Sequence, residues 1–114
     1  MYNQREIVLV PFPYTDLSNT KRRPVLIVSG NDYNHRHNDV IVAVISSNLS
    51  YKDDYSVSLE DKDLEIGILP ESSVIKVHKL FTISKSRIIK KFSLIRKEKF
   101  KAVFKILTKL FEIN

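Results

Sequence analysis

The chain has 114 residues, 43% hydrophobic and 28% charged, with 19 Lys and Arg against 13 Asp and Glu and a formal net charge of +6. This length suits a single folded domain, and the apolar content excludes a disordered tail. The absence of cysteine excludes disulfide scaffolds, Cys-ligated zinc sites and thiol nucleophiles. The longest apolar stretch, residues 7–14, is too short to span a membrane, and the N-terminus lacks a secretory signal pattern. We therefore expect a cytoplasmic protein with no membrane association.

The charge is concentrated in the C-terminal third. Residues 1–75 hold 7 Lys and Arg against 11 Asp and Glu, a net charge of −4, whereas residues 76–114 hold 12 against 2, a net charge of +10. Such asymmetry indicates a polyanionic partner, with nucleic acid first and an acidic membrane or acidic peptide second. The alternative interpretation is a solvated helix face.

Short β-rich runs separated by polar segments occupy most of the chain. The prolines at positions 11 and 13 are expected to end the first strand, and Pro24 to open the second after a loop over residues 14–23. The third strand is apolar on both faces, so it belongs inside a sheet. Six or seven such strands favour a small barrel or sandwich. The expected strands cover residues 7–10, 25–28, 40–45, 55–59, 73–77, 80–83 and 87–91.

The spacing of the apolar residues changes from about Arg96 onward. There they recur at steps of three and four, which predicts one amphipathic helix. We expect this helix to pack on the sheet, although a basic amphipathic helix can also lie on an anionic membrane. Its start is poorly marked, because Ser93 could cap it but lacks a Glu three residues later. One domain is expected over residues 1–114, with the β part to about residue 92 and the helix over about 95–112. The apolar stripe comprises Phe100, Val103, Phe104, Leu107, Leu110 and Phe111.

Three cations, Lys21, Arg22 and Arg23, immediately precede the second expected strand. Pro24 restricts Arg23 to an extended conformation, so at least one guanidinium lies beside rigid structure. The planar fork of arginine donors matches phosphate oxygens and predicts a phosphate clamp. A solvated basic loop is the alternative.

Polar side chains follow the third strand directly, at Ser46, Ser47 and Asn48. Hydroxyl and amide groups at the end of a buried strand emerge from a rigid platform, which is where positioned polar groups are useful. The alternative is ordinary strand termination, in which these side chains bond to their own backbone.

The histidines give a weaker signal. His35 and His37, with Asp39 nearby, resemble a partial metal site, but Arg36 between them repels a cation, and a surface loop is the favoured interpretation. His78 makes a two-histidine acid–base ribonuclease mechanism conceivable, with an exposed strand residue as the alternative. We expect no metal and no cofactor.

Three blocks of sequence, in order, resemble the PemK/MazF toxin family. They are EIVLVPFPYTDLSNTKRRPVLIVS at residues 6–29, VIVAVISS at residues 40–47 and KLFTISKSRI at residues 79–88, followed by the family's C-terminal helix. The resemblance implies a mainly β fold with a C-terminal α-helix, a small SH3-like barrel. It also implies a homodimer and a metal-independent endoribonuclease that cuts RNA at short preferred sequences, held inactive by a cognate antitoxin that we expect to be small, acidic and partly disordered.

By position, Arg23 corresponds to the family's catalytic arginine and Ser46 to the hydroxyl residue, typically threonine, that closes the third strand. Serine keeps the hydroxyl and loses the methyl group that helps to orient it. The expected chemistry is attack of the RNA 2′-hydroxyl on the adjacent phosphorus, which leaves a 2′,3′-cyclic phosphate and requires no metal-bound water.

Further side chains are expected to hold single-stranded RNA by charge and stacking. The rival hypothesis is a catalytically weak RNA- or DNA-binding regulatory module on the same barrel, for which the serine at position 46 is the argument. The substrate-binding candidates are Arg22, Lys21, Ser47, Tyr14, Lys79 and Phe81, with Tyr33 as a further stacking aromatic.

Overall fold

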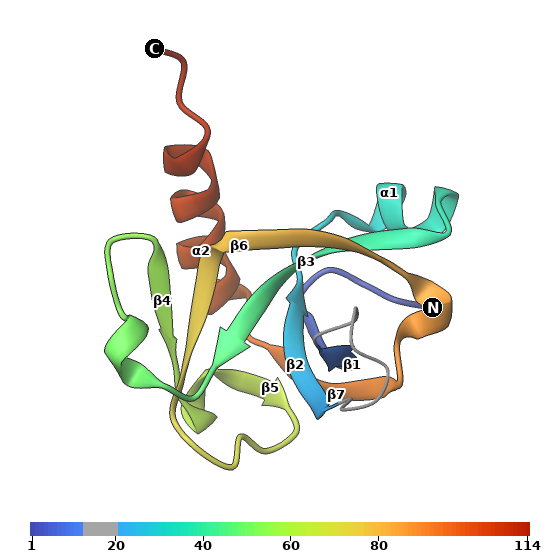
Figure 1. The fold of residues 1–114 in the computed structure, drawn as a ribbon, viewed down its shortest axis with the longest axis horizontal. Helices are drawn as coiled ribbons and strands as arrows, with labels where there is room; N and C mark the ends of the chain where they lie inside the picture. The colour runs from blue at the N-terminus through green and yellow to red at the C-terminus, as the bar shows by residue number, and fades with distance from the viewer. Residues whose placement is uncertain (13–20) are drawn as a thin grey trace.

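Antiparallel strands join in the order β4-β6-β3-β2-β1-β7-β5 and form one sheet that curls on itself, with a helix at its C-terminal end (Figure 1). This computed structural model describes residues 1–12 and 21–114. The mainly β fold class with a C-terminal helix is confirmed. The strands are β1 (Glu6–Phe12), β2 (Lys21–Ile27), β3 (Asp39–Ser46), β4 (Ser56–Leu59), β5 (Leu64–Ile66), β6 (Ser73–Ser84) and β7 (Lys90–Ile95). The helices are α1 (Asn31–Arg36) and α2 (Lys97–Leu110), with 3₁₀ turns η2 (Leu49–Tyr51), η3 (Asp61–Asp63) and η4 (Lys85–Arg87).

The first two strands are longer than the prolines predicted. β1 continues through Pro11, which lies opposite Arg22, and β2 begins at Lys21 rather than at Pro24. The described pairing of β7 with β1 ends at Leu9. Beyond Leu9 one side of β1 is an edge, where a proline without an N–H is tolerated. The three cations that were expected in a loop therefore lie on a strand.

The two strands expected at residues 73–77 and 80–83 are one continuous strand, β6. Its register against β3 shifts where Ala43 lies opposite Leu80 but the next residue, Val44, lies opposite Lys76. A bulge of this kind absorbs the extra residues and bends the strand without a turn. This bend helps to curl the sheet. Two other elements were missed, α1 in an expected loop and β5 in the acidic segment, and the last strand begins and ends later than predicted.

The two faces of the curled sheet each carry an apolar cluster. One cluster, with Ile7, Leu26, Ile45 and Ile75, is covered by Phe100 and Val103 of α2. The other cluster contains the neighbouring residues on the same strands, whose side chains point to the opposite face, among them Val8, Val25 and Val42. Both sets follow from strand alternation, because successive side chains point to opposite faces.

Only part of the predicted helical stripe is buried. Phe100 is 7% exposed and Val103 is fully buried, but Phe104 is 55% exposed and Phe111, beyond the helix, is 69% exposed. Ile106 and Leu107, farther along α2, pack against the core cluster, so the covered face of the helix leaves Phe104 outside. The C-terminal end of α2 and the chain after it extend past the sheet (Figure 1). The expectation that Phe104 and Phe111 pack in the core of this chain is wrong.

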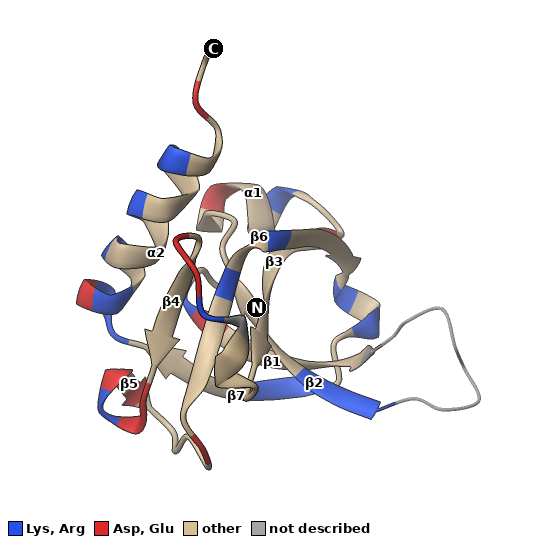
Figure 2. Ribbon diagram, turned by 60° about the vertical axis from the view of Figure 1, so that its left-hand side comes forward, with Lys and Arg blue, Asp and Glu red and all other residues tan. Residues whose placement is uncertain are grey.

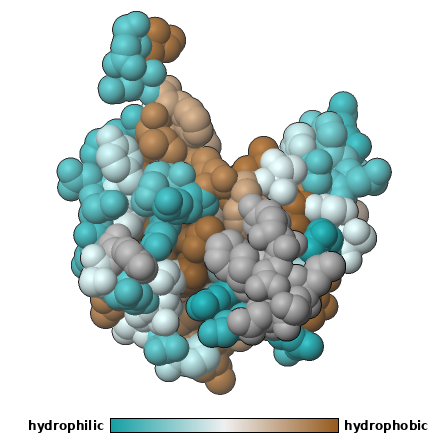
Figure 3. All heavy atoms as spheres, in the orientation of Figure 1, coloured by the Kyte–Doolittle hydropathy of each residue, from teal (hydrophilic) through white to brown (hydrophobic). Residues whose placement is uncertain are grey.

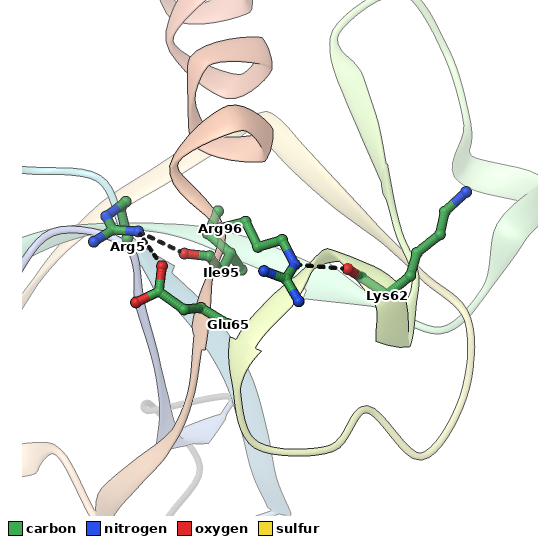
Figure 4. A network of polar contacts seen from close by, with 5 residues as sticks. All are labelled: Arg5, Lys62, Glu65, Ile95 and Arg96. Atoms are coloured by element: carbon green, nitrogen blue, oxygen red, sulfur yellow. Dashed lines mark hydrogen bonds and ion pairs between the residues drawn. The ribbon is translucent and has the colours of Figure 1, made fainter.

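Backbone anchors, rather than a side-chain cap, hold the start of α2 (Figure 4). Arg96 is the N-cap residue and makes no capping bond, but its Nε donates to the Lys62 carbonyl at 3.0 Å. Arg5 Nη1 donates to the Ile95 carbonyl at 2.9 Å and lies 3.5 Å from Glu65 Oε1. Ser93, the cap that the sequence suggested, lies buried within β7. These contacts connect the start of the helix to η3 and to Arg5, the residue before β1, and Arg5 in turn pairs with Glu65 of β5.

Positive charge is unevenly displayed on the fold (Figure 2). Lys and Arg gather at the start of β2, along β6 and on α2, whereas acidic residues gather around β5. No helix in the described part of the chain is long and apolar enough to cross a bilayer.

Candidate active site

Arg23 and Ser46 come together at the point where β2 begins and β3 ends. Val25 pairs with Val44, and continuing this antiparallel register by two residues places Arg23 opposite Ser46. Directly opposed residues share a face of the sheet, so both side chains enter the same recess. This central recess has a volume of ≈ 480 Å³. It is lined by Arg23, Val25, Val44, Ile45, Ser46, Ser47, Asn48, Lys76 and Lys79.

The Ser46 hydroxyl is oriented by the chain that follows it. The Asn48 N–H donates to Ser46 Oγ at 3.1 Å, and Asn48 Oδ1 in turn accepts from the Ser50 N–H at 3.1 Å. These are the strand-terminating bonds of the alternative interpretation. They occupy one acceptor position of the hydroxyl and leave its proton directed elsewhere, so termination and a role in the recess are compatible.

Two lysines of β6 complete the central recess. Lys79 was a substrate-binding candidate, whereas Lys76 was not, although both line the recess that holds Ser46. Lys76 pairs with Val44 of β3 across the register shift. Its position on a strand was evident in the sequence, but its neighbours depend on that shift, which no local pattern indicates.

A second, lysine-rich recess adjoins the first. This lysine recess of ≈ 490 Å³ is lined by Ser50, Lys52, Asp53, Lys76, His78 and Lys79, and it shares Lys76 and Lys79 with the central recess. Lys52 extends the basic lining beyond the two shared lysines, and Asp53 and His78 also line this recess. His78 is the one histidine among the described residues of this recess, which gives no geometric support to a two-histidine mechanism.

A third recess lies on the other side of Arg23. This Phe92 recess has a volume of ≈ 300 Å³ and shares Arg23, Ile45 and Ser47 with the central recess. Arg22 enters the Phe92 recess and not the central one, because it points to the opposite face of β2. The Phe92 recess is lined by Leu9, Arg22, Arg23, Pro24, Ile45, Ser47, Leu69, Pro70, Glu71, Ser73 and Phe92.

Of the remaining substrate-binding candidates, those that the structure describes do not line these recesses. Lys21 opens β2 but lines none of the three, and Phe81 lines a small pocket of ≈ 90 Å³ beside Arg87. Tyr14 falls outside the described residues. Tyr33 donates its hydroxyl to Asp39 Oδ1 at 2.6 Å, and this hydrogen bond raises the pKa of Tyr33.

The histidines of the α1 region make local contacts. The His37 ring stacks on Tyr33, with centroids 4.0 Å apart, and His35 Nε2 lies 3.2 Å from Asn3 Oδ1. Among the residues that the structure describes, no three of His, Cys, Asp and Glu come together as a possible metal site. The partial metal site suggested by His35, His37 and Asp39 is not assembled.

Sequence comparison identifies one protein family over nearly the whole chain. The model of the PemK-like, MazF-like toxins of type II toxin–antitoxin systems matches residues 3–111. A search of curated proteins returns no match.

Solved structures share the fold at low sequence identity. An endoribonuclease in complex with its cognate antitoxin, from a mycobacterial species, has a TM-score of 0.78 at 15% identity, covering 96% of this chain and 93% of that one. The Mycobacterium tuberculosis toxin MazF-mt6 has a TM-score of 0.76 at 20% identity, covering 96% and 99%. A MazE–MazF structure from Deinococcus radiodurans has a TM-score of 0.75 at 20% identity, covering 96% and 94%.

Proposed function

Because this chain belongs to the PemK-like, MazF-like toxin family of type II toxin–antitoxin systems, we propose that it is a toxin that cleaves single-stranded RNA. In this proposal the protein is a sequence-selective, metal-independent endoribonuclease that acts in the cytoplasm. One observation carries this proposal: an arginine fork, an oriented hydroxyl and two lysines line a single recess. Solved structures of similar fold include one described as an endoribonuclease, which supports the same activity.

The RNA supplies its own nucleophile. The 2′-oxygen forms a bond to the adjacent phosphorus while the bond to the 5′-oxygen breaks, leaving a 2′,3′-cyclic phosphate and a 5′-hydroxyl. The 2′-hydroxyl proton passes to solvent and the leaving oxygen takes up a proton. The protein must orient the phosphate and stabilise the charge that develops on its oxygens.

Arg23 and Ser46 match these two tasks. The guanidinium of Arg23 presents a planar fork to two phosphate oxygens. The Ser46 hydroxyl, whose oxygen accepts from the Asn48 N–H, donates its proton to a phosphate oxygen or orients the 2′-hydroxyl. Lys76 and Lys79 hold neighbouring phosphates, and Lys52 extends this charge along the lysine recess.

The partners follow from charge and exposed apolar surface. A positively charged recess attracts an acidic, partly disordered antitoxin segment as it attracts RNA, so the two compete. A similar structure is described as a complex with its cognate antitoxin. Figure 3 shows hydrophobic surface along α2. Phe104 on α2 and Phe111 just after it are exposed, and a homodimer interface would cover them.

The deciding experiment incubates the purified protein with a long RNA of mixed sequence and maps the new 5′ ends. We expect cuts at a short preferred sequence, with 2′,3′-cyclic phosphate products, unchanged in excess chelator. DNA of the same sequence, and RNA with the 2′-hydroxyl blocked at the scissile position, should remain uncut. Sedimentation of the same preparation measures whether the protein is a monomer or a dimer.

Two outcomes would overturn the proposal. Activity that is lost in chelator and restored by a divalent cation would replace 2′-hydroxyl attack with a metal-dependent reaction. Tight RNA binding without cleavage would favour the regulatory binding module.

A further inference from the structure

The Phe92 recess has features that phosphate chemistry does not use. It shares Arg23, Ile45 and Ser47 with the central recess, so a phosphate bound at Arg23 lies at its mouth. Its volume of ≈ 300 Å³ is at the small end for ligand pockets, which suits one planar ring system. A nucleotide whose phosphate lies at Arg23 can therefore place its base in this recess.

The walls of the Phe92 recess are suited to a base. Leu9, Pro24 and Pro70 contribute apolar surface, and Phe92 contributes a half-buried aromatic ring. Single-stranded RNA is read by splayed bases that stack on such rings. The backbone at Phe92 is closely packed, because a Cβ at Gly67 would lie 3.1 Å from the Phe92 carbonyl oxygen and 2.8 Å from Ser93 Cβ. The aromatic wall of the recess is thus attached to closely packed backbone.

Two opposite charges enter this recess from different segments. Arg22 comes from β2, and Glu71 from the segment between β5 and β6. Glu71 is exposed, and among the described residues no ion pair joins it to Arg22. The Glu71 backbone carbonyl accepts from the Ser73 hydroxyl at 3.0 Å, and Glu71 is one of the residues that line the recess.

A carboxylate beside a phosphate site repels RNA unless it accepts hydrogen bonds from a base. Guanine is the base that offers a carboxylate two adjacent donors, N1–H and the N2 amino group. Its O6 and N7 acceptors match an arginine fork. Adenine and cytosine present one amino group each, and uracil one imino N–H, so they satisfy a carboxylate less well.

Building on the proposed function, we propose that the Phe92 recess is a guanine-binding subsite next to the scissile phosphate. Glu71 is the specificity-determining residue and Arg22 supports it. The preferred cleavage sequence therefore contains a guanine at a fixed position beside the cut.

The test compares cleavage sites and binding for Glu71→Ala, Glu71→Gln and the wild-type protein. The control is Glu112→Gln, which makes the same charge change in the exposed C-terminal tail. Matched RNAs carry guanine, inosine or adenine at the position in question, since inosine lacks only the N2 amino group. Binding is measured on RNAs made uncleavable by a 2′-deoxy substitution at the scissile position.

For the wild type we expect guanine to be preferred over inosine and adenine by roughly 10-fold or more in binding and in kcat/KM. Glu71→Ala should abolish the difference between guanine and inosine, and it should lower the rate on the inosine RNA less than on the guanine RNA, because inosine keeps N1–H and lacks the N2 amino group. Glu71→Gln should shift preference toward adenine, which a carboxamide pairs well. Glu112→Gln should behave as wild type.

Guanine preference that survives Glu71→Ala, or mapped sites without a fixed guanine, would overturn the subsite. So would Glu71 variants that alter only antitoxin binding, which would assign the recess to the protein partner. If the wild type prefers guanine in binding but does not cut RNA, the guanine subsite is supported and the proposed ribonuclease activity is wrong.

Discussion

Arg22 and Arg23 are consecutive residues of β2, and of the two only Arg23 lines the recess that holds Ser46. Alternation along the strand sends Arg22 to the opposite face, toward Glu71 and Phe92. The same pair of cations thus serves two surfaces at the rim of the curled sheet. Variants of the two arginines should have different effects.

Arg23→Lys keeps the positive charge but removes the bidentate fork. We expect the cleavage rate at saturating RNA to fall by roughly 10²-fold or more, with little change in affinity, as when a preorganised donor at developing charge is removed. Single-turnover cleavage and RNA binding measure the two effects. Arg36→Lys is the matched control, because Arg36 lies on α1 and pairs with Asp32. A wild-type rate for Arg23→Lys would remove Arg23 from the mechanism.

Ser46→Ala removes the hydroxyl and Ser46→Thr keeps it. We expect Ser46→Ala to lower the cleavage rate by roughly 10-fold to 10²-fold, because the hydroxyl positions the substrate without carrying the reaction. Ser46→Thr should retain activity, since its hydroxyl can still accept from the Asn48 N–H. Equal rates for the Ala variant and the wild type would contradict a role for this hydroxyl.

Lys79→Ala removes a cation shared by the central recess and the lysine recess. We expect weaker RNA binding and a salt dependence whose logarithmic slope is reduced by about 0.7, the value for one phosphate contact on a single strand. Lys101→Ala, on α2 and outside the three recesses, should weaken binding only slightly. Titrations at several salt concentrations check this, and identical slopes for Lys79→Ala and wild type would count against a phosphate contact.

Gly67→Ala should destabilise the fold. Gly67 has a φ of +97°, and an added Cβ would lie 2.8 Å from Ser93 Cβ. Backbone strain and overpacking together should lower the free energy of unfolding by about 1–3 kcal/mol. Gly30→Ala is the control, because a Cβ there meets nothing within 4 Å. Urea denaturation compares the two, and equal stability would show that the Gly67 turn relaxes.

Tyr33 should ionise above its ordinary pKa of 10.0, because its hydroxyl donates to Asp39. A raised pKa in the folded state stabilises the fold while the tyrosine is protonated, below pH 10. This contribution is lost as the pH rises through the folded-state pKa. Difference titration of tyrosinate absorbance against Tyr33→Phe isolates this group, and Tyr33→Phe should show a shallower loss of stability with alkaline pH. A normal pKa would contradict the bond.

Local patterns in the sequence determined the fold class and the family. Strand alternation and apolar runs placed the central strands, since those residues are buried whatever their exact partners. The order of three sequence blocks indicated the toxin family, which the match over residues 3–111 confirms. Arg23 and Ser46 were selected as candidates from the same blocks, together with the strand-end position of the serine.

Only the tertiary structure decided which side chains meet. The register of β2 on β3 brings Arg23 to Ser46, and a register shift on β6 adds Lys76, which strand periodicity alone does not place. The exposure of Phe104 was likewise undetermined, because periodicity identifies an apolar stripe but not which part of the stripe faces the sheet: Ile106 and Leu107 pack against the core, and Phe104 does not. The tertiary structure likewise decides that Arg22, Glu71 and Phe92 line one recess. These contacts join segments distant in the chain, and their geometry is set by sheet curvature and bulges that no local run of residues encodes.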